Sequence, residues 1–132
     1  MELEAFELVL LRRPADPPAY DSATLDRIQR EHLMYHNSLR ASGKVLTNGP
    51  VDDQADTSLR GLTFYRTGSL ARSRALAEAD PAVRAGRLTV EIMTWYCAPG
   101  TMRLPGLRIS GPLARRRTTA SGISRIGARE PG

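Results

Sequence analysis

Two histidines are the residues of this chain best suited to moving protons. His32 and His36 stand four positions apart, so they share one face of a helix about one turn from each other. A histidine whose pKa lies near neutrality can accept and donate a proton, which makes His32 the first candidate for a general acid–base residue and His36 the second. The alternative is that both are core histidines with satisfied hydrogen bonds.

Asp80 is the carboxylate with the clearest local setting. It stands directly before Pro81, where its side chain can accept a hydrogen bond from a free amide at the start of a helical turn. Capping alone would explain it, whereas the functional alternative is that Asp80 orients His32 or accepts a proton itself. At about 1.5 Å per residue His32 lies well inside its helix, which leaves direct contact with Asp80 open.

The remaining reactive side chains give weaker signals. Arg12, Arg13 and Asp52 belong to segments expected at the same end of the sheet as Asp80, where they could rim a pocket. Of these, Arg12 and Asp52 are the candidates for ligand binding. Cys97 ends a predicted strand without a positioned base, which argues against a nucleophile.

Nothing in the sequence predicts a metal or a cofactor. Histidines at this spacing can chelate a metal ion, but two ligands need a third. No third histidine exists, and no Cys-x-x-Cys pair occurs. Neither a Gly-x-Gly-x-x-Gly run nor a P-loop is present, so nucleotide binding is not expected.

Hydrophobic periodicity and turn residues divide the chain into alternating elements. The first helix is capped by Asp21 or Ser22 and stops at Gly43, with an apolar stripe that includes both histidines. Ser69 caps a second helix, and Asp80 starts a short turn of helix that ends at Gly86. The predicted strands span residues 5–11, 44–48, 59–66 and 88–96.

The order β-α-β-β-α-β predicts an α+β fold, the ferredoxin-like plait, in which both helices cover one face of a four-stranded antiparallel sheet. The other face is then left without cover. The last strand places Val90 and Ile92 on one face and Met93 and Trp95 on the other, so both faces carry apolar side chains. A second copy of the sheet is the simplest cover, and the sequence therefore predicts a homodimer through this face.

Charge and composition separate the chain into two parts. The 132 residues suit one domain, which we expect over residues 1–97, where 12 basic residues meet 13 acidic ones. Residues 98–132 hold seven arginines against Glu130 and are rich in glycine and proline, so this tail is expected to be largely disordered. Because the folded part is nearly neutral, nucleic-acid binding is not predicted, although the tail could meet an anionic partner.

The setting expected from composition is the bacterial cytoplasm. One cysteine cannot form a disulfide within the chain, and no apolar run reaches the length of a membrane helix. The acidic start lacks the basic region of a signal peptide. Eighteen of the 19 basic residues are arginine, a bias typical of GC-rich bacterial genomes.

Over residues 5–97 the sequence resembles the YCII-related proteins of the dimeric α+β barrel superfamily. The matching stretches are Glu31-His32-Leu33, the run 42–50 from Ser42 to Pro50, the run 79–86 with its Asp-Pro-x-Val-x-Ala-Gly pattern, and the closing strand 90–96. The resemblance implies the plait and homodimers in which two sheets close a barrel. It also implies a site at the histidine of the first helix and the aspartate before proline, here His32 and Asp80.

The activity implied by the resemblance is broad. One relative removes chloride from a chlorinated hydroxyquinol, and related families include isomerases, cofactor-free monooxygenases and a haem-dependent dechlorinase. We therefore expect a cofactor-free lyase or isomerase-type enzyme that applies a His/Asp acid–base pair to a small aromatic-derived or lactone substrate. The alternative is a non-catalytic module that binds a small ligand in the same cleft.

Overall fold

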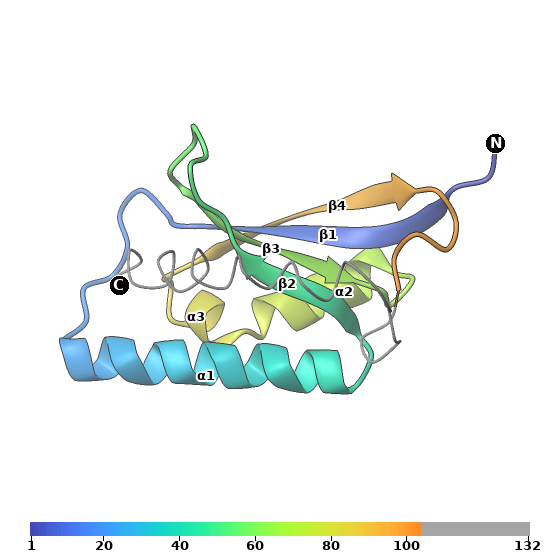
Figure 1. The fold of residues 1–132 in the computed structure, drawn as a ribbon. Coiled ribbons are helices and arrows are strands. Elements are labelled where there is room, and N and C mark those ends of the chain that lie inside the picture. Colours follow the sequence, from blue (N-terminus) through green and yellow to red (C-terminus); the bar gives the residue numbers. More distant parts are fainter. Residues whose placement is uncertain (104–132) are drawn as a thin grey trace, which may run out of the picture.

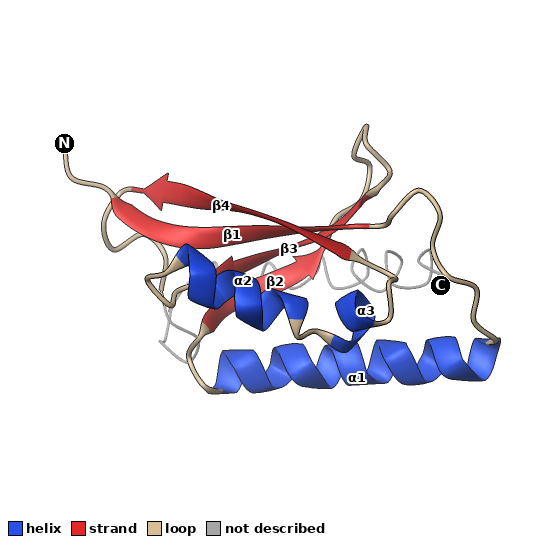
Figure 2. Cartoon of the chain, turned by 180° about the vertical axis from the view of Figure 1, so that it is seen from behind, coloured by secondary structure: helices blue, strands red, loops and turns tan. Residues whose placement is uncertain are grey.

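The computed structural model of the chain describes residues 1–103, which form a four-stranded sheet with a layer of helices (Figure 1). The elements follow in the order β1 (Glu4–Arg12), α1 (Ser22–Ala41), β2 (Val45–Pro50), β3 (Leu59–Tyr65), α2 (Leu70–Glu78), α3 (Pro81–Arg84) and β4 (Thr89–Cys97). The strand order is β2-β3-β1-β4, and every neighbouring pair is antiparallel. All three helices lie on one side of the sheet (Figure 2). The predicted α+β ferredoxin-like plait is confirmed.

Each helix begins where a capping side chain was expected. Asp21 accepts from the amide of Thr24 at 2.8 Å, and Ser69 accepts from the amide of Arg72 at 3.1 Å. These side chains satisfy amides that the first helical turn leaves without partners. The chain leaves α1 through Gly43, whose φ of 79° lies in the left-handed region that glycine tolerates best.

The core lies between the sheet and the helices. Val9 and Leu11 of β1 pack there with Leu39 of α1 and Ala77 of α2, and all four are buried. Burying such side chains contributes about 1.5–3 kcal/mol for each large one, which holds the helical layer against the sheet. The helix that carries both histidines is thereby held against the strands.

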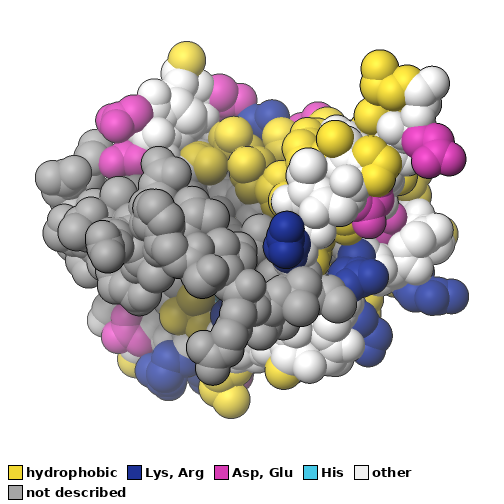
Figure 3. All heavy atoms as spheres, turned by 45° about the vertical axis from the view of Figure 1, so that its right-hand side comes forward, with side chains coloured by type: hydrophobic (Ala, Val, Ile, Leu, Met, Phe, Trp, Pro, Cys, Tyr) yellow, Lys and Arg dark blue, Asp and Glu magenta, His cyan; other side chains and the backbone are white. Residues whose placement is uncertain are grey.

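The opposite face of the sheet carries an apolar patch, which we call the open-face patch. The register pairs Leu8 with Phe64 and Met93, and pairs Phe6 with Trp95, so these side chains share a face. The patch comprises Phe6, Leu8, Leu10, Leu62, Phe64, Met93 and Trp95. Hydrophobic side chains gather at the top of the space-filling view, on the side of the sheet away from the helices (Figure 3).

The strand boundaries differ from the prediction at the sheet edge and in the register. β2 continues through Gly49 to Pro50, where a stop was expected. Because β2 is an edge strand, a residue that lacks an amide hydrogen can be accommodated there. The pairing of β1 with β3 also shifts by one residue, so Arg60 forms a β-bulge opposite Leu11 and Arg12.

The expectations about membrane helices, the domain and the tail concern the whole chain, of which the structure describes residues 1–103. Within residues 1–103, no helix has the length and apolar character needed to cross a bilayer. β4 ends at Cys97, and the domain boundary expected there stays a prediction. The tail predicted for residues 98–132 lies almost entirely outside the described residues, which end at Arg103.

Candidate functional site

A cavity of about 480 Å³ lies between the first half of α1 and the sheet. Its wall is mixed: apolar side chains of α1 and β1 meet a histidine, three arginines and a threonine. The residues relevant to chemistry in this wall are Arg13, Asp26, His32, Arg60, Thr63 and Arg87. Its volume lies within the roughly 300–1,000 Å³ that is usual for small-molecule sites.

Asp80 and the two histidines form a hydrogen-bonded cluster beside this cavity. Nδ1 of His32 lies 2.8 Å from Oδ2 and 2.9 Å from Oδ1 of Asp80, and Nε2 of His36 lies 2.8 Å from Oδ2. Oδ1 also accepts from the amide of Ala82 at 2.8 Å, so Asp80 caps α3 as the sequence predicted. The structure joins the capping role and the contact with His32 in one carboxylate.

Asp80 is held as a carboxylate in a buried place. Its side chain is 1% exposed, and burial alone would raise the pKa of the carboxyl group. Hydrogen bonds from His32 and His36 outweigh burial and lower the Asp80 pKa from 3.8 to about 2. Asp80 is therefore ionised at neutral pH, and its carboxylate orients the N–H groups of the two histidines that hydrogen-bond to it.

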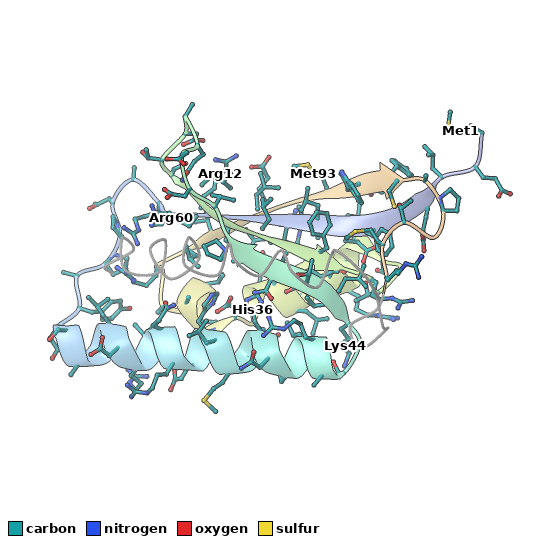
Figure 4. All side chains as sticks on the ribbon, viewed as in Figure 1. Met1, Arg12, His36, Lys44, Arg60 and Met93 are labelled. Carbon is teal, nitrogen blue, oxygen red and sulfur yellow. The ribbon has the colours of Figure 1, made fainter. Side chains whose placement is uncertain are left out.

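His36 is the buried member of the histidine pair. Its side chain is 3% exposed, and its ring centroid lies 4.6 Å from that of His32. Figure 4 shows it between α1 and the short helix α3. Its Nδ1 atom is buried and hydrogen-bonds to no group within the described part of the chain. Because a carboxylate can only accept, Nε2 is the ring nitrogen of His36 that donates to Asp80.

His32 is the member that faces the cavity. Its side chain is 16% exposed and forms part of the cavity wall. Because Nδ1 donates to Asp80, Nε2 is the nitrogen left to meet a bound molecule. A carboxylate behind one ring nitrogen favours the charged imidazole that forms when the other nitrogen takes a proton. This arrangement can perform general acid–base chemistry.

The same cluster has the composition of a metal site. His32, His36 and Asp80 each offer one ligand atom, and these atoms lie within 4.8 Å of one another. Asp80 is thus a possible third ligand. It lies 44 positions beyond His36 in the sequence, so the local spacing of the histidines did not reveal it. A metal ion would have to replace the protons that the histidines now donate to Asp80. Both histidines contact Asp80 through these protons.

The other predicted site residues lie in different places. Arg13 lines the cavity, but Arg12 lies on the opposite face of the sheet (Figure 4), where it pairs with Asp56 at 2.6 Å and Glu91 at 2.9 Å. The pKa of Arg12 is raised, first by the hydrogen bond to Glu91. Asp52 is not part of the cavity wall. Ligand binding by Arg12 or Asp52 stays a prediction that the cavity does not support.

Four of the six wall residues relevant to chemistry escaped the sequence analysis: Asp26, Arg60, Thr63 and Arg87. In a regular strand Arg60 would share a face with Leu62, so its place in the wall depends on the bulge. Thr63 alternates with Leu62 and Phe64 along β3 and so lies on the helical face, but nothing in the sequence suggested a cavity there. Arg87 follows the glycine that ends α3, and only the folded arrangement brings it to the cavity.

The sequence of this chain is similar to one family of known protein domains. A model of the YCII-related domain family matches residues 8–96. A search of curated protein sequences finds no match. Among solved structures, the chain is similar to the 5-chloro-2-hydroxyhydroquinone dehydrochlorinase of Burkholderia phenoliruptrix AC1100 in complex with 2,5-dihydroxybenzoquinone. The TM-score is 0.49 and the identity 19%, over 68% of this chain and 92% of that one.

Proposed function

The chain belongs to the YCII-related domain family, and we propose that it is a small enzyme in which His32 and Asp80 act as an acid–base pair. The observation that carries this proposal is the 2.8 Å contact between Asp80 and Nδ1 of His32, made while the His32 ring borders the cavity. A general base needs to be within reach of a bound molecule and to be oriented by a partner, and this pair meets both needs.

In the proposed reaction, Nε2 of His32 removes a proton from the bound molecule. The ring then carries a positive charge that the Asp80 carboxylate stabilises without taking the proton, since its pKa is about 2. His32 returns the proton to another atom of the same molecule or to a leaving group. This is the chemistry of an isomerase or a lyase, and the proton transfers call for no cofactor.

A small aromatic-derived or lactone substrate suits the cavity. Leu11, Leu25 and Ile28 give it an apolar side that can hold a ring. His32 lies in the same wall and can reach a polar group on that ring. The size of the cavity favours a molecule of one or two rings over a polymer.

The alternative function is a module that binds a small molecule without changing it. One observation favours it: Asp80 caps α3, and both histidines satisfy its remaining acceptor sites, so the cluster also has a purely structural purpose. If the cluster is only structural, replacing His32 by a neutral residue affects stability and changes no reaction. If His32 is the acid–base residue, the same replacement slows proton transfer to and from the bound molecule.

The experiment is proton exchange in D₂O, followed by proton NMR over a set of small lactones and hydroxylated chloroaromatic compounds. An acid–base enzyme replaces an acidic carbon-bound proton of a suitable compound by deuterium, or releases its leaving group. In His32→Gln we expect this rate to fall by roughly 10²–10⁴, with the melting temperature followed in parallel. The matched control is Arg30→Gln, an exposed change on the same helix, which should leave the rate unchanged.

Two outcomes would decide against the enzyme. One is a rate in His32→Gln equal to that of the unchanged protein. The other is binding without exchange: compounds that bind equally to both proteins, with no proton exchange or product in either. The second outcome would favour the ligand-binding module.

We further propose that the protein is a homodimer through the open-face patch. Phe64 and Trp95 stack edge to face at 5.1 Å there, and Met93 is 37% exposed. The ion pairs of Arg12 give the patch a polar edge, as protein interfaces commonly have. Covering the apolar area that these side chains still expose, at roughly 25 cal/mol per Å², supplies the driving force for a dimer.

Light scattering tests the dimer. We expect a mass near twice 14.5 kDa at micromolar concentration, and a lower mass for Met93→Lys, which puts a charge into the patch. Arg84→Gln, on the helical side, is the control and should not change the mass. A monomer of 14.5 kDa in the unchanged protein would contradict the proposal.

We also propose that residues 1–97 are the functional domain and that it works in the cytoplasm of a bacterium. The family match over residues 8–96 supports the boundary. The single cysteine and the arginine-rich composition support the location. Expression of residues 1–103 alone should give the same proton-exchange rate, and loss of that rate would contradict the boundary.

A further inference from the structure

The charges around the cavity are unbalanced. Arg13, Arg60 and Arg87 line it and are half-buried, whereas the acidic residue of the wall, Asp26, is exposed. An exposed charge is screened by water and salt more strongly than a half-buried one. Even with the buried Asp80 carboxylate behind His32 counted, three arginines face two carboxylates, so the cavity presents a net positive charge to a bound molecule.

The arginines come together because of the sheet register. Arg12 of β1 pairs with Leu59 of β3 on one side and with Thr89 of β4 on the other. Each of the three arginines of the cavity lies one or two residues from a member of this row, so all three come to the same end of the sheet. Arg60 is the bulged residue of β3, and bulges commonly re-aim a side chain beside an active site. Figure 4 shows Arg60 at this end of the sheet, where β1 ends.

These guanidinium groups keep donors for a ligand. Arg13 and Arg60 also interact within the chain, but each guanidinium has five N–H donors in a planar fork. Arg87 enters the cavity from the turn before β4. A planar carboxylate can accept two parallel hydrogen bonds from one such fork, which makes it the best match for the group.

Thr63 supplies a second, independent sign of a polar ligand. Its side chain is 1% exposed and belongs to the cavity wall. Its hydroxyl oxygen is buried and has no hydrogen-bond partner within the described residues. A buried hydroxyl without a partner is costly, so a ligand oxygen is a natural partner for it.

We propose that the molecule bound in this cavity is a small carboxylic acid, its carboxylate held by Arg87, Arg60 and Arg13 with the hydroxyl of Thr63, and its apolar body turned toward α1. The inference rests on the proposed function in taking this cavity as the substrate site. The apolar wall at Ile28, one helical turn before His32, then holds the carbon body near that histidine. The proton-transfer end and the charged end of the molecule are thus recognised by different groups.

The test compares two probes of the same shape, 4-hydroxybenzoate and 4-hydroxybenzamide, on the full chain by calorimetry and NMR. We expect the acid to bind at least about tenfold more tightly than the amide, a difference of ~1.4 kcal/mol. Arg87→Gln should remove that preference, because it removes the charge and keeps the hydrogen-bonding amide. Arg84→Gln, an exposed arginine three positions away and outside the cavity wall, is the matched control and should keep it.

Arg60→Gln is the second variant if Arg87→Gln does not fold, and it should lower the preference in the same way. Equal binding of acid and amide, no binding of either, or a preference that survives in both variants would overturn the inference. Inorganic phosphate that competes as strongly as the acid would show a site for bare anions and would overturn the carboxylic-acid class.

The outcomes separate this inference from the proposed enzyme. If His32→Gln binds 4-hydroxybenzoate with the full preference while no compound exchanges protons, the carboxylate site stands and the enzyme proposal fails. If a neutral compound is turned over through His32 and the acid binds no better than the amide, the enzyme stands and the carboxylate site fails.

Discussion

Asp80 and Glu7 are both buried carboxylates under the helical layer, 1% and 5% exposed. Each supports the start of a helix: Asp80 caps α3, and Glu7 accepts from the amide of Thr67 at 2.9 Å in the turn before α2. Their partners differ. Asp80 meets two histidines, whereas Glu7 meets the hydroxyl groups of Thr67 at 3.1 Å and Ser73 at 2.8 Å.

The difference lies in what a neighbour can do with a proton. Hydroxyl and amide groups do not change charge near neutral pH, so the Glu7 cluster can only hold structure. An imidazole group can take up and release a proton in that range, and one of the two imidazoles on Asp80 also borders a cavity. Burial of a carboxylate is common to both places and therefore does not identify a site, whereas its partners do.

The two carboxylates also use their oxygens differently. Asp80 accepts at both oxygens, because Oδ1 meets Ala82 and Oδ2 meets His36. In the described part of the chain, the hydrogen bonds to Glu7 all reach Oε1. An amide replacement can keep one acceptor oxygen but turns the other into a donor. The same chemical change therefore has unequal consequences at the two positions.

The largest expected effect is a loss in the free energy of unfolding that is greater in Asp80→Asn than in Glu7→Gln. Asn at position 80 must point an N–H₂ group at a histidine donor, so we expect a loss of about 2–4 kcal/mol in the free energy of unfolding. Gln at position 7 keeps its oxygen on the same donors and should lose less than about 1 kcal/mol. Urea unfolding at neutral pH measures both. Equal losses would break the distinction drawn between the two clusters.

The next largest effect is the loss of stability at low pH. The Asp80 pKa is lowered from 3.8 to about 2, so its contribution to stability is complete above pH about 4 and is lost as pH falls toward 2. The shift corresponds to ~2 kcal/mol at neutral pH. The difference in unfolding free energy between the unchanged protein and Asp80→Asn should shrink by that amount over this range. A constant difference from pH 5 to pH 2 would contradict the role given to the histidines in holding the charge.

Local signals were enough to predict most of the fold. Asp21, Ser69 and Asp80 were expected as caps, and each one accepts the hydrogen bond of a cap. Gly43 was expected as the end of α1, and it adopts the left-handed conformation. Caps and turns depend on a few neighbouring residues, so a sequence carries them in full.

The site was only partly predictable, because it depends on contacts distant in sequence. His32 and Asp80 were named separately, but their 2.8 Å contact spans 48 positions and follows from the packing of α3 on α1. Arg12 was named as a ligand-binding candidate and Arg60 was not named. The bulge in β3 brings Arg60 to the cavity, whereas the strand alternation takes Arg12 to the other face. One residue of register decides the face on which a side chain lies, and register is not a local property.

The smallest expected effect tests the structural half of the comparison, through Ser73→Ala. Ser73 is fully buried and donates to Glu7 at 2.8 Å, so its loss removes one of the hydrogen bonds to that carboxylate. Glu7 keeps the amide and the hydroxyl of Thr67, and we therefore expect a cost of only about 1 kcal/mol in unfolding free energy. Ser38→Ala, an exposed change on α1, is the control and should not lower stability.

The rate of proton exchange that depends on His32 should be the same in the unchanged protein, in Ser73→Ala and in Ser38→Ala. A fall in that rate in Ser73→Ala, at a temperature where the variant is folded, would show that the Glu7 cluster also serves the site.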